Sequence, residues 1–254
     1  MTRSVEWDAS SYDAQALPQQ EWGQVVLERL QLSGDEAVLD AGCGTGKTTQ
    51  SILERIPDGR LIGVDASAAM IDEARATLGD DPRVELRVAD LTELDLEDEV
   101  DAVFSSATFH WILEHELLFE RLFAALRPGG RMEAQCGGDG NIAEIHRALE
   151  ALSGDERFAP YLRSEQRTWN FAGVGNTETR LKRAGFEVEN VWLEAWPITP
   201  RDPGGFVRTV ILPWHLERLP EGLHEEFIEA VLESQPRPLS VSYVRLNISA
   251  RRPG

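Results

Sequence analysis

The stretch that decides the fold is Ala37-Val38-Leu39-Asp40-Ala41-Gly42-Cys43-Gly44-Thr45-Gly46-Lys47-Thr48. Its apolar start predicts a short buried strand that ends near Asp40. The three alternating glycines predict a turn in which the backbone approaches another group closely, because glycine has no Cβ to collide. A helix is predicted from there to about Ile56, where Pro57 stops it. The order strand, glycine turn, helix is typical of the first unit of an α/β sheet.

The same alternation of strand and helix continues on both sides of this stretch. In the first half we predict a helix over 19–32 closed by Gly34, strands over 61–65, 84–90 and 100–106, a helix capped by Ser67 that runs to 78, a helix over 114–126, and a fifth strand after Arg127-Pro128-Gly129-Gly130. Beyond Cys136 we predict helices over 142–152 and 177–184, a strand over 186–194, a helix that carries Leu223, Phe227, Val231 and Leu232, and a last strand through Val244, Leu246 and Ile248. The whole pattern predicts a doubly wound, Rossmann-like α/β fold.

Composition and charge exclude several classes of protein. The 254 residues carry 25 basic and 44 acidic side chains, so the net charge is −19, and such a surface repels nucleic acid and anionic membranes. No apolar run reaches the roughly 18 to 20 residues of a membrane helix, and the N-terminus has no signal-peptide pattern. Two cysteines, Cys43 and Cys136, are too few for a disulfide framework. We therefore expect a cytoplasmic protein that binds neither nucleic acid nor membrane.

The glycine turn fits more than one kind of ligand site. With Ala41 in place of the first glycine, the segment to Lys47-Thr48 fits a phosphate-binding P-loop, in which Lys47 would contact the terminal phosphates. A dinucleotide fingerprint fails, because Lys47 occupies the third glycine position. Asp40 would repel phosphates at the following helix N-terminus but suits a cationic ligand. Asp40 therefore favours a cation over a nucleotide, while a plain turn without ligand stays an alternative.

Asp40 with Gly42, Gly44 and Gly46 resembles the D-x-G-x-G-x-G loop of class I S-adenosylmethionine-dependent methyltransferases. The resemblance implies that S-adenosylmethionine is the cofactor and S-adenosylhomocysteine the product. It also implies that Asp65, at the end of the second strand, accepts from the ribose hydroxyls, and that Asp90 and the Leu91 amide contact adenine. The full set of implied cofactor residues is Tyr12, Gln20, Asp40, Gly42, Cys43, Gly44, Asp65, Ala66, Met70, Asp90, Leu91 and Ser106.

The segment after the fourth strand, Ser105-Ser106-Ala107-Thr108-Phe109-His110-Trp111, indicates the class of acceptor. It lacks the Pro-Pro-aromatic motif of enzymes that methylate bases. Together with the N-terminal Trp7-Asp8-x-x-x-Tyr12-Asp13, it resembles the small-molecule branch that contains trans-aconitate and malonyl-acyl-carrier-protein methyltransferases. The resemblance covers about residues 7–136 and implies methylation of a carboxyl oxygen, with methylation of another O, N or C atom as the alternative.

His110 and Trp111 are the predicted catalytic residues. A carboxylate acceptor is already anionic and needs no base, whereas a hydroxyl, amine or carbon acid would need His110 to remove a proton. The other interpretation is structural, with His110 bonded to a carbonyl and Trp111 filling the pocket floor. The remaining histidines, His115, His146, His215 and His224, are expected at the surface and show no metal-ligand spacing.

An anionic acceptor needs cations in an acidic protein. Residues 157–208 contain eight basic and six acidic side chains, which reverses the sign of the chain. We therefore expect Arg163, Arg167, Arg201 or Arg208 to bind an acceptor carboxylate, beside Trp7 from the N-terminal arm. For any one of these arginines, a solvated surface position is the alternative.

These observations predict a seven-stranded methyltransferase sheet whose last strand is antiparallel, with helices on both faces and a small helical cap. We expect residues 1–152 to form the N-terminal arm and the cofactor-binding half, and residues 153–254 to complete the same domain. The cap is expected in two inserted segments, 153–169 and 197–235. The sequence does not indicate an oligomeric state.

Overall fold

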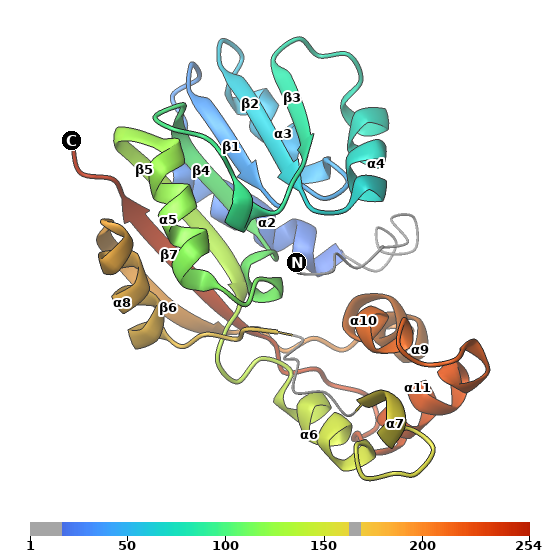
Figure 1. The fold of residues 1–254 in the computed structure, drawn as a ribbon. Helices are drawn as coiled ribbons and strands as arrows, with labels where there is room; N and C mark the ends of the chain where they lie inside the picture. Colours follow the sequence, from blue (N-terminus) through green and yellow to red (C-terminus); the bar gives the residue numbers. More distant parts are fainter. Residues whose placement is uncertain (1–16, 163–168) are drawn as a thin grey trace.

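Seven β-strands of the described chain form one mixed sheet (Figure 1). The computed structural model describes residues 17–162 and 169–254, with side chains from Glu21 onward. The strands are β1 (Ala37–Ala41), β2 (Arg60–Asp65), β3 (Val84–Val88), β4 (Val100–Ser106), β5 (Leu126–Gly137), β6 (Glu187–Ala195) and β7 (Val244–Arg251). Their order is β3-β2-β1-β4-β5-β7-β6, and β7 is antiparallel to both of its neighbours. The predicted seven-stranded methyltransferase sheet is confirmed.

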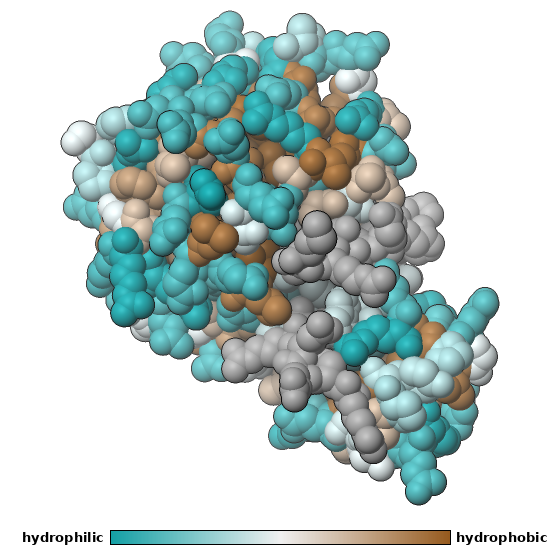
Figure 2. Space-filling view, in the orientation of Figure 1, coloured by the Kyte–Doolittle hydropathy of each residue, from teal (hydrophilic) through white to brown (hydrophobic). Residues whose placement is uncertain are grey.

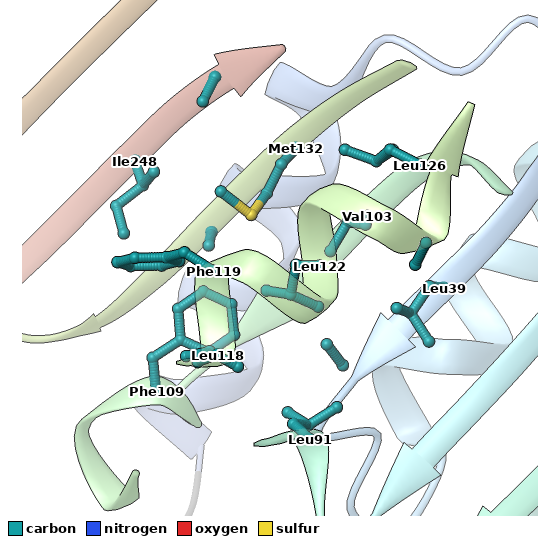
Figure 3. Packing of buried hydrophobic residues seen from close by; sticks show 14 of the residues in the cluster. Leu39, Leu91, Val103, Phe109, Leu118, Phe119, Leu122, Leu126, Met132 and Ile248 are labelled. Carbon is teal, nitrogen blue, oxygen red and sulfur yellow. The ribbon is translucent and has the colours of Figure 1, made fainter. Parts of the chain in front are cut away.

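Helices cover both faces of the sheet, as predicted. On one face α2 (Leu17–Leu30) lies over β4 and β5, while α3 (Lys47–Arg55) and α4 (Ala68–Leu78) lie over β2 and β3. On the other face α5 (His115–Ala125) and α8 (Val174–Ala184) pack side by side. Figure 3 shows Leu118, Phe119 and Leu122 of α5 pointing at Val103 and Met132 of the sheet. Fully buried apolar side chains on both faces supply the main stabilisation of this layered fold.

Some element ends differ from the prediction for local reasons. The Ser67 hydroxyl caps α4 by accepting from the Met70 amide at 3.3 Å, as expected. The third strand ends at Val88, because Asp90 instead caps the short 3-10 turn η1 (Leu91–Glu93). The fifth strand starts before the Pro-Gly-Gly segment: Val100 pairs with Leu126 and Ala102 with Arg131, so residues 127–130 form a bulge inside β5.

A second apolar core lies beyond the carboxyl ends of the parallel strands (Figure 1). It is built from α6 (Ala143–Leu152), α7 (Ala159–Leu162), α9 (Pro203–Phe206), the π-turn η3 (Val207–Ile211), α10 (Pro213–Leu216) and α11 (His224–Glu233). We call this group of helices the cap. Because Ile145 and Ala148 of α6 are buried in it, the cap core begins N-terminal to the segment proposed at 153–169. Trp22 of α2 joins the same core, so sheet and cap share a packed boundary.

Hydrophilic side chains cover most of the visible face of both the sheet region and the cap (Figure 2). The large exposed apolar side chains, Val25, Val88, Leu117 and Leu193, are scattered over four elements. Of the helices in the described ranges, none combines the length and the apolar character of a membrane span.

A buried carboxylate fixes the entry to β1. Glu36, 7% exposed, accepts from the Ser33 and Gly34 amides at 2.8 and 2.9 Å and from Arg131 Nη2 at 2.7 Å. Burial alone would raise the pKa of Glu36, but the Arg131 guanidinium and the backbone amides outweigh it and lower the pKa to about 2. The interaction therefore stabilises the fold above the ordinary carboxyl pKa and is lost as the pH falls toward 2.

We predict that Glu36→Gln lowers the free energy of unfolding by about 3 kcal/mol at neutral pH, which is the size of this pKa shift. The loss should shrink to near zero as the pH falls toward about 2, because Glu36 is then protonated in both states. Urea unfolding between about pH 7 and 3 measures it, with Glu54→Gln on the exposed side of α3 as control. An unchanged pH dependence in Glu36→Gln would contradict this account.

Candidate functional site

The glycine turn between β1 and α3 lies at the carboxyl edge of the parallel strands, which is the place of the ligand crevice in α/β folds. Gly42, Gly44 and Gly46 all have left-handed backbones, with φ of 89°, 53° and 82°. A Cβ on Gly42 would lie 2.1 Å from Thr108 Oγ1, so only glycine lets the turn pack against the loop after β4. A Cβ on Gly44 would meet nothing within 4 Å, which shows that this side of the turn is open. The turn thus presents bare backbone to an open space.

The three predicted aspartates lie at neighbouring ends of strands around this turn. Asp65 accepts from the Gly44 amide at 3.0 Å and from the Ser67 amide at 2.9 Å. Asp90 accepts from the amide and the hydroxyl of Thr92 at 2.9 and 2.8 Å. Since β1, β2 and β3 are adjacent and parallel, their carboxyl ends meet at one edge of the sheet. The edge is therefore lined by carboxylates whose positions are held by backbone amides and a threonine.

Burial gives two of these carboxylates perturbed pKa values. Asp40 is 1% exposed, and its burial, together with the charge of Asp65, outweighs a 2.6 Å hydrogen bond from Thr49 Oγ1 and raises the pKa to about 7. Burial also raises the pKa of Asp65, against the amides of Ser67, Gly44 and Ala66. A cation placed in the crevice would stabilise both charged forms. The electrostatics of the turn thus favour a positively charged ligand.

Other residues of the predicted cofactor set surround the same turn. Cys43, Met70 and Leu91 are buried, Ala66 is exposed, and burial raises the pKa of the Cys43 thiol. Ser106, at the end of β4, has a buried hydroxyl for which the described residues supply no hydrogen-bond partner. Lys47 is exposed in the first turn of α3. Tyr12, Trp7 and the Gln20 side chain lie outside the described part of the structure.

The chain turns sharply where it leaves β4. Ala107 has a left-handed backbone with φ of 58°, and its amide donates to the Gln135 carbonyl at 2.8 Å. Backbone strain of this kind is typical of functional sites. The following 3-10 turn, η2 (Phe109–Trp111), buries Phe109 in the sheet core and places His110 and Trp111 in the wall of a pocket.

The pocket lies between this turn, the start of β7 and the cap. Its volume is about 460 Å³, counted to its open mouth. The residues that line it are Ala107, His110, Trp111, Asn141, Ile142, Trp169, Phe171, Val210, Ile211, Tyr243 and Arg245. The predicted catalytic pair therefore faces a real pocket at the carboxyl edge of the sheet, where ligands of α/β folds bind.

His110 is a neutral hydrogen-bonding group. Its Nδ1 accepts from the Gly137 amide at 3.3 Å. Burial, the positive charge of Arg245 and the neighbouring His115 lower the pKa of His110 well below its ordinary range. Because Nδ1 is the acceptor, the single ring proton of the neutral imidazole is on Nε2. The ring thus offers the pocket a donor, and its Nδ1 lone pair is occupied by the protein.

Arg245 is a functional candidate that the sequence analysis missed. It lies on β7, is 2% exposed, donates from Nε to Gln135 Oε1 at 3.1 Å and stacks its guanidinium 4.3 Å from the Trp22 ring. In the sequence it alternates with Val244 and Leu246, as a solvent-facing strand residue does. Trp22 of α2, which lies over this face of the sheet, helps to bury it. No local signal in the sequence predicts that cover.

The arginines predicted to bind the acceptor occupy other places. Arg208 forms an ion pair with Glu225 on α11, and Arg201 is exposed; neither lines the pocket. Arg163 and Arg167 fall outside the described residues. Their role stays a prediction, whereas Arg245 is the cation that the described structure places in the pocket wall.

The expectation that the other histidines lie at the surface is wrong for two of them. His115 is 1% exposed, and its Nε2 is 2.8 Å from the Phe109 carbonyl, which holds the turn of His110 in place. His215 is 7% exposed, and burial lowers its pKa to about 4. His115 begins α5 and His215 lies on the short helix α10, and the acids next to them in the sequence, Glu114, Glu116 and Glu217, are exposed. No group of metal-ligating side chains occurs within the described ranges.

Comparisons with known proteins agree with this architecture. Residues 38–130 match the family model described as a methyltransferase domain. The chain is 30% identical over 260 aligned residues to trans-aconitate 2-methyltransferase of Escherichia coli O1:K1, covering 97% of this chain and 98% of that enzyme. It is 31% identical to the Methylobacterium nodulans enzyme of the same name, covering 75% of this chain and 68% of the relative.

Two further similarities are more partial. Malonyl-[acyl-carrier protein] O-methyltransferase 1 of Ilyobacter polytropus is 34% identical, but the match spans 48% of this chain and 46% of that enzyme. Phosphoethanolamine N-methyltransferase 2 of Haemonchus contortus, solved with S-adenosyl-L-methionine, has the same fold with a TM-score of 0.64. It is 20% identical and covers 97% of this chain and 57% of that chain. The glycine turn is thus that of a methyltransferase and not a P-loop, and the chain belongs to the class I S-adenosylmethionine-dependent methyltransferases.

Proposed function

We propose that this enzyme transfers the methyl group of S-adenosylmethionine to a carboxylate oxygen of a small molecule. The observation that carries the proposal is the pair of groups in the pocket wall: a buried guanidinium, Arg245, and a neutral imidazole, His110, that presents an N–H. A guanidinium and an N–H donor are the groups that recognise a carboxylate. The trans-aconitate and malonyl relatives carry names of carboxyl methyltransferases, which supports the same class of acceptor.

The residues around the glycine turn fit the cofactor. Asp65 would accept from the ribose hydroxyls, Asp90 and the Leu91 amide would contact adenine, and the open side of Gly44 would leave room for the methionine part. Asp40, buried beneath the turn, would favour the positive charges of the ligand. The buried Ser106 hydroxyl at the end of β4 supplies a further polar contact.

Methyl transfer to a carboxylate requires an oriented acceptor and the exclusion of water more than it requires acid–base catalysis. Bound S-adenosylmethionine supplies a methyl carbon on a sulfonium sulfur, and attack by a carboxylate oxygen yields a neutral ester and S-adenosylhomocysteine. No proton moves in this step, so a base is unnecessary. Arg245 and His110 would hold the carboxylate, and Trp111 with the cap side chains would exclude water. Exclusion of water matters because two opposite charges disappear in the reaction.

Methylation of a hydroxyl, amine or carbon acid is the alternative, and it requires His110 as base. The geometry favours it less, because Nδ1 already accepts from the Gly137 amide. A small molecule as acceptor and the exclusion of nucleic acid are parts of the proposal, and the net charge of −19 supports the latter.

The ribose assignment predicts a loss of cofactor affinity in Asp65→Ala. We expect the dissociation constant of S-adenosylmethionine to rise by at least about tenfold, because two charge-assisted hydrogen bonds are lost. The control, Lys47→Ala, should stay within about twofold, since Lys47 is exposed in the first turn of α3. Calorimetry measures both; an unchanged constant in Asp65→Ala would place the ribose elsewhere.

Because the pKa of Asp40 is raised, we predict that the affinity for S-adenosylmethionine depends on pH. The Asp40 pKa of about 7 lies above the ordinary value because of burial, so below about pH 7 a proton must leave before a cation is stabilised. Affinity for S-adenosylmethionine should therefore rise by up to about tenfold per pH unit as the pH approaches 7 from below and level off above it. Calorimetry in two buffers of different ionisation enthalpy detects the released proton. Asp40→Asn keeps an acceptor for Thr49 and should remove that part of the pH dependence; an identical pH profile in both proteins would refute the assignment.

His110→Gln separates the two roles of the histidine. Glutamine donates a hydrogen bond but removes no proton, so kcat/KM should stay within about tenfold if His110 is a donor to a carboxylate. Loss of a general base would instead lower kcat by about 100-fold or more. Steady-state kinetics with the acceptor that the enzyme methylates decide between the two. A loss of about 100-fold or more in kcat would favour a hydroxyl, amine or carbon acceptor.

A further inference from the structure

The wall of the pocket contains few charged or polar side chains. Of its eleven lining residues, all in the described ranges, Arg245 is the one with a permanent positive charge, and none is an acid. Three more carry polar groups: His110, whose proton is on Nε2, Asn141, whose Oδ1 accepts from the Val244 amide at 2.9 Å, and Tyr243, which has a hydroxyl. Arg245 belongs to β7, His110 to the turn η2 and Asn141 to the β5–α6 connection, so the described wall carries a single permanent charge.

Most of the other lining side chains are aromatic or aliphatic, and Trp111 and Phe171 lie directly beside His110, with ring centroids 5.1 and 5.8 Å away. Trp169 and Phe171 stack with ring centroids 5.6 Å apart and planes 9° from parallel, and Trp111 lies 5.9 Å from Trp169. Val210 and Ile211 of the π-turn η3 add aliphatic surface from the cap, and both are buried. Flat rings and branched aliphatic side chains bind the apolar body of a ligand, and none of these five side chains carries a charge that could pair with a second carboxylate.

We propose that the acceptor is a monocarboxylate with an apolar, preferably flat, body, whose carboxylate lies at Arg245 and whose body lies against Trp111, Trp169 and Phe171. This inference rests on the proposed function and names its class of substrate. It differs from a tricarboxylate such as the one in the names of the full-length relatives. Arg245 is then a specificity-determining residue, together with the aromatic side chains of the same wall.

The physical basis is the cost of burying a charge. A second carboxylate on the acceptor would be desolvated against rings and aliphatic side chains, and an unpaired buried charge costs several kcal/mol. The net charge of −19 adds long-range repulsion for every further negative charge. One guanidinium in the described wall therefore selects for one carboxylate.

Matched pairs of acceptors test this inference on the unmodified enzyme. Hexanoate and adipate have the same chain length and differ by one terminal carboxylate, and cinnamate and 4-carboxycinnamate form the flat pair. We expect kcat/KM to be at least about 100-fold higher for the monocarboxylate of each pair. Monomethyl adipate, in which the second charge is removed, should recover most of the loss. A higher kcat/KM for adipate, 4-carboxycinnamate or trans-aconitate would overturn the inference.

Arg245→Gln tests whether Arg245 binds the carboxylate of the acceptor. Glutamine at this position can still bond to Gln135, and we expect kcat/KM for hexanoate to fall by at least about 100-fold while the affinity for S-adenosylmethionine is retained. The control on the same strand is Arg251→Gln, whose arginine pairs with Glu189 at the surface and should leave turnover unchanged. Full activity in Arg245→Gln would overturn the role of Arg245.

The outcomes also separate this inference from the proposed function. Methyl ester formation on any carboxylate supports the proposed function, and the ranking within the pairs decides the class of acceptor. If di- or tricarboxylates are esterified faster, the proposed function stands and the inference falls. If hydroxyl, amine or carbon acceptors are methylated and carboxylates are not, both fall.

Discussion

Three successive left-handed glycines between β1 and α3 are the constraint on which the rest of the site depends. They bring the backbone against Thr108 of the β4 exit and leave the Gly44 amide pointing at Asp65. The same turn thus fixes the distance between the ends of three strands. Because Asp40 is buried beneath it, the turn also sets the sign of the ligand charge that the crevice prefers. A side chain at Gly42 would push these parts away from each other, since its Cβ would lie 2.1 Å from Thr108 Oγ1 and 2.6 Å from Thr108 Cβ.

The antiparallel strand β7 has a comparable role for the pocket that Arg245 and His110 line. Its pairing with β5 places Asn247 opposite Gln135, and Arg245 reaches Gln135 Oε1 from the same face. Asn247 accepts from Gln135 Nε2 at 3.1 Å, so the three side chains form a buried polar ladder beneath Trp22. The ladder holds the guanidinium in the wall of the pocket. His110, on the turn after β4, lies in the same wall.

The sequence predicts the sheet and the positions of three aspartates at its carboxyl edge, because these signals are local. Asp40, Asp65 and Asp90 each follow an apolar run, and parallel strands necessarily bring such positions to one edge. The pocket lined by His110, Trp111 and Arg245 is predicted less well, because it depends on contacts between elements that are far apart in the sequence. The sequence pattern around Arg245 is that of a solvent-facing strand residue, although the side chain is buried in the structure. His115 and His215 have the pattern of surface residues, and both are buried as well. The charge reversal over residues 157–208 pointed at Arg201 and Arg208, of which Arg208 is paired with Glu225.

The position of the transferred methyl group tests the central claim most directly. Turnover with S-adenosylmethionine labelled with carbon-13 in its methyl group, on a mixture of acids, alcohols and amines, can be followed by two-dimensional NMR. The account predicts that the label correlates through one oxygen with a carboxyl carbon, as in a methyl ester. A label on nitrogen, on carbon or on an ether oxygen, with carboxylates left unmodified, would contradict it.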